Sequence, residues 1–154
     1  MSNIEKFQAA LDKTYPHEFT YRFANKMIEI SEEEVVSDFT FPKNADFYKG
    51  HFPGNPVTPG TILLECALQS GVVPLLKFQL YKDGLKIDNK HVLILSSEIK
   101  YKKMVPPNTR VMVTAKKTSY LAAAEHLRCR ILMKTESGKT ILHGKVSAKL
   151  LEVK

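Results

Sequence analysis

Residues 50–60 read GHFPGNPVTPG and residues 61–81 read TILLECALQSGVVPLLKFQLY, and together they give the clearest indication of the fold. Prolines recur at every third position over residues 53–59, which predicts a stiff, extended segment with all three rings on one side. The second part has helical length and is apolar nearly all round, so we expect a buried helix. Glu65 and Lys77, among other residues, interrupt it too often for a membrane span.

The flanking segments predict β-structure on both sides of this helix. Two short alternating strands are expected within residues 19–41. Longer strands are expected at residues 91–105, 109–119, 123–135 and 139–153, with Glu136-Ser137-Gly138 as a hairpin turn and a short amphipathic helix (Ile4, Phe7, Leu11) ending before Pro16. We therefore predict an α+β fold in which a curved antiparallel sheet wraps around one long central helix.

Length and composition favour one domain over residues 1–154, because the chain is 44% hydrophobic and has the commonest size of a single core. Charges within residues 1–16 argue against a signal peptide, so we expect a cytoplasmic protein. Cys66 and Cys129 form neither a Cys-x-x-Cys pair nor a cluster with histidines. We expect no metal site and two buried thiols.

The charge balance of 23 Lys plus Arg against 16 Asp plus Glu, a net +7, favours an acidic partner. The basic residues are spread along the second half of the chain without a helix-turn-helix or zinc-finger pattern, so nucleic acid is not expected to be that partner. Most of these side chains are expected to lie on solvated strand faces.

Four residues in or just after the proline-rich stretch have side chains or main-chain groups suited to catalysis. Gly60 lies where a helix begins, and its free N–H is suited to an oxyanion. Glu65 is surrounded by apolar residues that would keep its carboxyl neutral and proton-donating. Each also has a simpler interpretation: His51 as a turn residue, Glu65 as a salt-bridge or dimer contact, and Gln69 as a hydrogen-bond partner of Glu65. The remaining histidines are expected to be structural or exposed: His17, His91, His126 and His143.

The joint pattern resembles the β-hydroxyacyl-acyl-carrier-protein dehydratases of fatty acid synthesis. The string is His-Phe-Pro-Gly-x-Pro-x-x-Pro-Gly, with Glu fourteen residues after the His and Gln four further on. The matching positions are His51, Phe52, Pro53, Gly54, Pro56, Pro59, Gly60, Glu65 and Gln69. A basic segment with prolines at residues 99–107 is similar to the family's strand after the helix. Residues 18–23 and Cys66 depart from the family pattern, which leaves substrate preference open.

The resemblance implies a hot-dog fold and a lyase that eliminates water from 3-hydroxyacyl thioesters to give trans-2-enoyl products. It implies His51 as the base, Glu65 as the acid and the Gly60 N–H as the donor to the thioester carbonyl. The other expected substrate-binding residues are Phe52, Val57, Pro59 and Gln69. The resemblance also implies no cofactor, an acyl carrier protein as substrate carrier, and a homodimer or dimer-based oligomer with sites at the subunit interface.

Two other functions fit the same fold. A hot-dog thioesterase would use an acid near the helix to activate water, although it would need neither the proline string nor His51. A non-catalytic acyl-thioester-binding subunit would not need to retain both chemical residues. The pathway is expected to be fatty acid or polyene- and polyketide-like synthesis.

Overall fold

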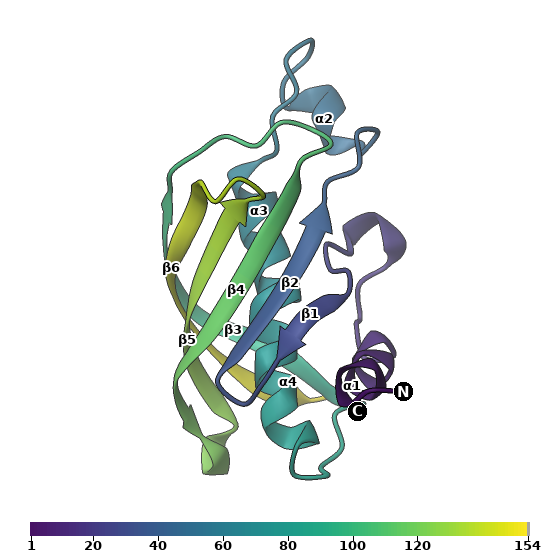
Figure 1. The fold of residues 1–154 in the computed structure, drawn as a ribbon, viewed down its shortest axis with the longest axis vertical. Coiled ribbons are helices and arrows are strands. Elements are labelled where there is room, and N and C mark those ends of the chain that lie inside the picture. Colours follow the sequence, from purple (N-terminus) through teal and green to yellow (C-terminus); the bar gives the residue numbers. More distant parts are fainter. Residues whose placement is uncertain (154) are drawn as a thin grey trace.

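A six-stranded antiparallel sheet forms the centre of the computed structural model, which describes residues 1–153 apart from the side chain of Phe19 (Figure 1). Its order is β1-β2-β4-β5-β6-β3, so β1 and β3 are the two edges. The bounds are β1 Met27–Ile30, β2 Glu34–Thr40, β3 Lys90–Tyr101, β4 Arg110–Leu121, β5 His126–Thr135 and β6 Thr140–Glu152. All neighbouring pairs are antiparallel, which confirms the predicted sheet.

The predicted central helix is confirmed as 22 continuous residues running along one face of the sheet (Figure 1). It consists of α3 (Gly60–Ala67), a π-helical turn η2 (Leu68–Val72) and α4 (Val73–Tyr81). At Gly71 an added Cβ would lie 3.1 Å from the Cβ of Ala115, so this glycine allows the helix to approach β4 closely. The helix is long and apolar enough to cross a membrane, but 67% of its most apolar window is buried, as in a core helix.

Alternation along the strands separates a core face from an outer face. In β5 the inward residues are buried and the outward arginines are exposed: Leu127, Cys129, Ile131 and Met133 against Arg128 and Arg130. Cys66 and Cys129 are buried free thiols, as predicted, and burial raises the pKa of each to about 12. Neither thiol is suited to react as a thiolate near neutral pH.

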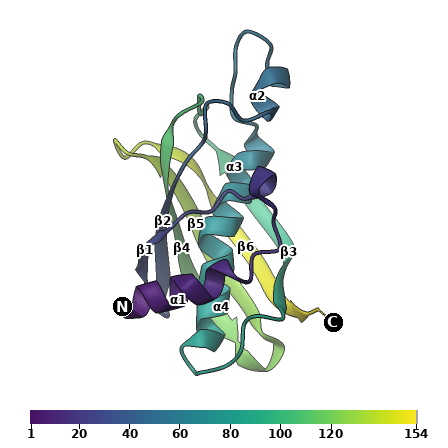
Figure 2. The same cartoon turned by 90° about the vertical axis from the view of Figure 1, so that its right-hand side faces the viewer.

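The N-terminal helix α1 (Asn3–Asp12) packs across α4 and β1 (Figure 2). Ser2 and Glu5 form a capping box at its start, and the ring of Phe7 contacts those of Phe78 and Tyr81 with centroid distances of 5.1 and 4.9 Å. Just after α1, the buried amine of Lys77 donates to Thr14 Oγ1 at 2.6 Å. Burial lowers the pKa of Lys77 to about 8.

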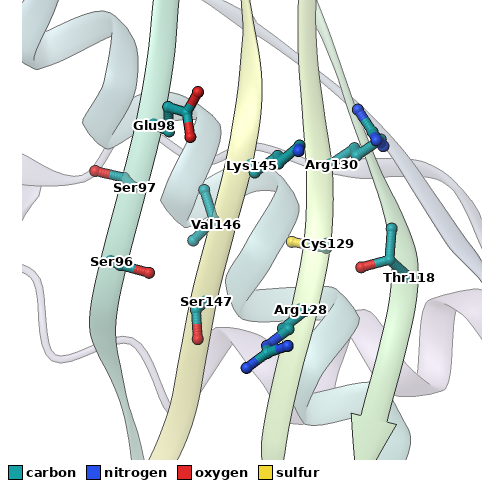
Figure 3. A pocket seen from close by; sticks show the side chains of 10 residues that line it. All are labelled: Ser96, Ser97, Glu98, Thr118, Arg128, Cys129, Arg130, Lys145, Val146 and Ser147. Atoms are coloured by element: carbon teal, nitrogen blue, oxygen red, sulfur yellow. The ribbon is translucent and has the colours of Figure 1, made fainter.

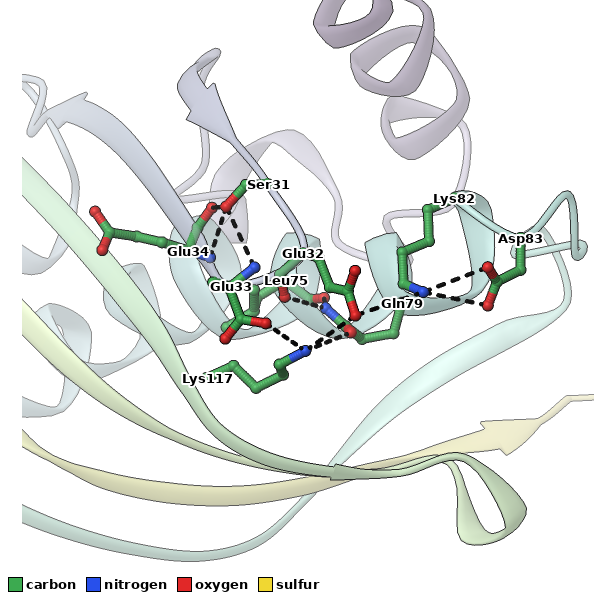
Figure 4. A network of polar contacts seen from close by, with 9 residues as sticks. All are labelled: Ser31, Glu32, Glu33, Glu34, Leu75, Gln79, Lys82, Asp83 and Lys117. Carbon is green, nitrogen blue, oxygen red and sulfur yellow. Dashed lines mark hydrogen bonds and ion pairs between the residues drawn. The ribbon is translucent and has the colours of Figure 1, made fainter.

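Polar contacts fix the turn between β1 and β2 against β4 and α4 (Figure 4). Lys117 of β4 pairs with Glu32 at 3.5 Å and Glu33 at 3.0 Å. Gln79 of α4 donates to the carbonyl of Glu32 at 2.9 Å. These contacts hold the sheet edge against the end of the helix that is remote from Gly60.

Two expected strand boundaries were wrong. Residues 102–105 leave the sheet, because the carbonyl of Val105 accepts from the N–H of Thr58 and two prolines follow it. The segment before His126 forms a 3₁₀ turn, η3 (Ala122–Ala124), in which Glu125 has a left-handed backbone. The structure also contains two short elements that were not predicted: η1 (Phe19–Tyr21) and α2 (Phe47–Gly50).

Candidate active site

The proline-rich loop contains a folded turn at residues 52–55, so the prediction of one continuous extended stretch was wrong. The main chains of Phe52 and Asn55 exchange hydrogen bonds of 3.1 and 2.9 Å, and Gly54 has a φ of +73°. Glycine adopts this backbone without strain, which allows the turn after Pro53. Residues 56–59 have no regular secondary structure, and Pro59 has φ −56° and ψ 137°, close to polyproline II.

His51 is fixed at the start of this loop. Its Nδ1 lies 2.8 Å from the carbonyl oxygen of Val57, and the Val57 N–H donates to the His51 carbonyl at 2.8 Å. A carbonyl oxygen only accepts, so Nδ1 carries the proton, and Nε2 of the neutral ring has a free lone pair. The ring also stacks on Phe52 with centroids 4.2 Å apart. This tautomer is the one that a general base acting through Nε2 requires.

A hollow of about 500 Å³ contains four of the predicted site residues. Those four are His51, Phe52, Val57 and Gly60, and the other lining residues are Thr58, Leu63, Tyr101, Lys102, Lys103 and Met104. Gly60 opens α3, and within residues 1–153 its N–H donates no hydrogen bond. A Cβ there would lie 3.3 Å from the Tyr101 ring, so this glycine also makes room for Tyr101. Pro59 is the N-cap residue that sets the direction of the helix.

Glu65 lies in a second group of residues, half-buried on α3. Its Oε1 accepts from Gln69 Nε2 at 2.8 Å, as expected for residues four apart on a helix. Gln69 is itself buried, donates to the Tyr21 carbonyl at 3.0 Å and accepts from the Phe23 N–H at 2.7 Å. His17 Nε2 lies 3.5 Å from the same Oε1. The immediate neighbours of the carboxyl group are therefore partly polar, and Gln69 is the hydrogen-bond partner that the sequence offered as one interpretation.

The His51 group and the Glu65 group lie on different sides of α3. Leu63 lines the His51 hollow, and Glu65 is two residues further, about 200° around the helix. Within the described chain no hydrogen bond or ion pair joins His51 to Glu65. A second hollow of about 480 Å³ lies on the side of Ile62, one turn before Glu65, and its lining includes four aromatic rings: Tyr21, Phe23, Phe39 and Phe47.

A larger hollow of about 710 Å³ lies on the outer face of the sheet, away from all of these residues (Figure 3). It is lined by hydroxyl and basic side chains, including Arg128, Arg130 and Lys145. The size of a hollow therefore does not identify the predicted site, because this larger hollow contains none of the predicted residues. Residues 1–153 contain no group of three or more His, Cys, Asp or Glu side chains placed to hold a metal ion.

Two residues at the site were not expected from the sequence. Tyr101 lines the His51 hollow because the pairing of β3 with β6 ends beside α3, and burial raises its pKa. His17, expected to be structural or exposed, instead lies beside Glu65. No local spacing indicates this contact, because 48 residues separate the two in the chain.

Comparison with known proteins identifies the family. The ApeI dehydratase family model matches residues 27–140. The 3-hydroxyacyl-acyl-carrier-protein dehydratases FabZ of Streptococcus gordonii and of Streptococcus agalactiae serotype V are each 32% identical, over 70% and 75% of this chain and 73% and 76% of theirs. Both matches agree with the resemblance carried by residues 51–69.

Solved structures confirm the fold. The dehydratase heterocomplex ApeI:P from Xenorhabdus doucetiae aligns with a TM-score of 0.74 at 10% identity, covering 93% of this chain and 91% of that one. A hypothetical thioesterase with coenzyme A from Streptococcus pneumoniae aligns with a TM-score of 0.61 at 9% identity, covering 97% of each. At such identities the likeness concerns the hot-dog fold alone, which dehydratases and thioesterases share. The sequence matches decide between them, and the chain belongs to the ApeI-like dehydratase family.

Proposed function

We propose that this chain eliminates water from 3-hydroxyacyl thioesters carried on an acyl carrier protein, giving trans-2-enoyl thioesters in fatty acid or polyketide-like synthesis. The observation that carries the proposal is that His51, whose Nδ1 is held by the Val57 carbonyl so that Nε2 is left unprotonated, lines the same hollow as Gly60, whose N–H donates no hydrogen bond within residues 1–153. A base and an oxyanion donor at one hollow are what α-proton abstraction beside a thioester carbonyl requires.

In the proposed reaction His51 Nε2 takes the α-proton, and the electron pair forms the new double bond as the C–O bond at C3 breaks. Glu65 gives its proton to the departing hydroxyl, which leaves as water. The Gly60 N–H stabilises the charge on the carbonyl oxygen, a contribution of about 3 kcal/mol for one such donor. Phe52, Val57 and Pro59 shape the hollow. Side chains carry every proton, so the mechanism uses no metal or redox cofactor.

We also propose that the complete site needs two chains, in a homodimer or dimer-based oligomer. His51 and Glu65 lie on different sides of α3, so a second chain would bring its Glu65 to the first chain's His51. The edge strand β3 supports this, since it pairs on one side only and exposes Leu93 by 44% and Leu95 by 50%. Mixing inactive His51→Ala and Glu65→Ala chains should restore activity, and no recovery despite subunit exchange would contradict it.

Incubation with a 3-hydroxyacyl thioester tests the reaction directly. Enoyl thioester as the product supports a dehydratase. Free thiol as the product would instead indicate a thioesterase, the class of one structural neighbour. No turnover would indicate an acyl-thioester-binding subunit. Because another neighbour is part of a dehydratase heterocomplex, each assay should include the protein alone and with any co-purifying chain.

The carrier protein is proposed to dock at the mouth of the His51 hollow. Lys102 and Lys103 are exposed there, and the chain has a net charge of +7. Charge-steered association weakens with salt, whereas a small pantetheine thioester is uncharged at its reacting end. Between about 50 and 500 mM salt, kcat/KM should fall for the carrier-bound substrate only. The reason is that salt shortens the Debye length and so screens the attraction between the two proteins. If kcat/KM fell equally with salt for the carrier-bound and the free thioester, there would be no reason to assign these lysines to carrier-protein binding.

We place this activity in the cytoplasm and in a single domain formed by residues 1–154. All six strands belong to one sheet around one helix, which supports the single domain. Limited proteolysis tests it: one protected core is expected, and two separately stable fragments would contradict it.

A further inference from the structure

His17 contacts the predicted acid from a part of the chain that the reaction does not otherwise involve. It lies in the segment between α1 and η1, with Nε2 3.5 Å from Glu65 Oε1. Its ring lies between those of Tyr15 and Tyr21, with centroid distances of 6.4 and 6.0 Å. The aromatic neighbours hold the imidazole in place, so its orientation toward Glu65 is set by packing.

The other ring nitrogen of His17 indicates its tautomer. Nδ1 is buried and has no hydrogen-bond partner within the described residues. A buried N–H without an acceptor is costlier than a buried lone pair. In the neutral ring the proton is therefore on Nε2, which faces the carboxyl oxygen of Glu65.

Both donors near Glu65 face the same oxygen. Gln69 Nε2 donates to Oε1 at 2.8 Å, and His17 Nε2 lies 3.5 Å from the same oxygen, a contact longer than an ordinary hydrogen bond. No hydrogen bond or ion pair reaches Oε2 within residues 1–153. Oε2 is therefore the oxygen free to hold the proton that the reaction transfers.

We propose that His17 is a positioning residue whose Nε2–H, acting with Gln69, closes on Oε1 of Glu65 during the reaction and leaves Oε2 to deliver the proton. The inference rests on the proposed dehydratase function. Hydrogen bonds to a charged acceptor are shorter and stronger than those to a neutral one. The contact therefore tightens as Glu65 becomes a carboxylate, which favours the transition state over the ground state.

The other groups around His17 are neutral or already paired, so Glu65 is its main electrostatic partner. From its own segment it faces the neutral rings of Tyr15 and Tyr21, and burial together with Glu65 raises the pKa of Tyr21. The cation of Arg22 lies over the Tyr15 ring at 4.5 Å, but it is paired with Asp12 at 2.6 Å. From α3 it faces Glu65.

Two variants at one position separate donation from packing. His17→Phe keeps the ring but removes the donor, whereas His17→Gln places an amide N–H near the position of Nε2. For His17→Phe, kcat should fall about three- to tenfold with little change in KM, and the high-pH limb of the pH–rate profile should move to higher pH, because the carboxylate loses a donor. His17→Gln should restore most of both. His126→Phe, remote on β5, is the matched control and should change neither.

An unchanged profile for His17→Phe, or equal loss in both His17 variants, would overturn the proposal. Nitrogen-15 spectra of the imidazole test it without turnover: the neutral ring is expected as the Nε2–H tautomer, and an Nδ1–H tautomer would contradict it. If wild-type protein dehydrates no 3-hydroxyacyl thioester, the proposed function fails, while the spectra still decide whether His17 donates to Glu65.

Discussion

The two sides of the site are held by different means. His51 is fixed through the main chain, because its Nδ1 donates to the carbonyl of Val57. Glu65 is fixed through side chains, because Gln69 holds its carboxyl and is in turn held by the main chain of Tyr21 and Phe23. The geometry of the first side therefore depends on loop conformation, and that of the second depends on the identity of buried residues.

The largest expected effect is loss of either chemical group, which tests whether both sides act in one reaction. His51→Ala and Glu65→Ala should each lower the rate of dehydration about 100-fold or more, as general acid–base loss does. Circular dichroism and thermal unfolding should show that both variants fold. If either variant keeps more than about a tenth of the wild-type rate, its assigned role is wrong.

A smaller effect should distinguish the two means of support. Gln69→Leu removes the donor to Glu65 and leaves the Phe23 N–H and the Tyr21 carbonyl without partners. We expect kcat to fall about tenfold and the free energy of unfolding to fall by about 1–3 kcal/mol. Val57→Ala keeps the carbonyl that holds His51, so kcat should change less than about threefold. An equal loss of kcat in Gln69→Leu and Val57→Ala would mean that the two sides of the site are not held by different means.

The loop conformation itself is tested at Gly54. Gly54→Ala has open space for a methyl group, but its φ of +73° strains any L residue. Stability should fall by about 1 kcal/mol, with a modest loss of kcat as His51 loses its fixed orientation. Gly50→Ala is the matched control, since a Cβ there also meets nothing and its φ is not positive. Equal denaturation midpoints for Gly54→Ala and Gly50→Ala would show that an L residue at position 54 introduces no backbone strain.

The sequence predicted those features that depend on local spacing. The central helix, the alternation in β5 and the Glu65–Gln69 contact all follow from periodicity within about one segment. The contact of His17 with Glu65 depends on how the chain after α1 packs, which no local pattern indicates. The spacing of prolines at every third residue did not indicate the turn at Gly54. A glycine with positive φ can interrupt an extended run that prolines alone would continue.

The smallest expected effect on activity is at Lys77, which belongs to neither side of the site and connects α4 to the end of α1. Lys77→Met should leave kcat unchanged and alter only the pH dependence of stability. The folded protein has a pKa of about 8 for this amine, below the ordinary 10.5 of an unfolded chain. Between these values the folded state has released a proton that the unfolded state still binds, so stability rises with pH.

That rise amounts to at most about 3 kcal/mol between pH 8 and 10.5, and it is lost as the pH falls from 10.5 to 8. Urea unfolding of wild type and Lys77→Met at pH 7 and 10 measures it as a difference. The buried thiols, whose pKa values are raised to about 12, act in the opposite direction at high pH but are common to both proteins and cancel. Lys86→Met, which removes an exposed lysine, should show no such difference from wild type. Parallel pH dependences for wild type and Lys77→Met would mean that the amine is not desolvated, and that its bond to Thr14 is a surface contact.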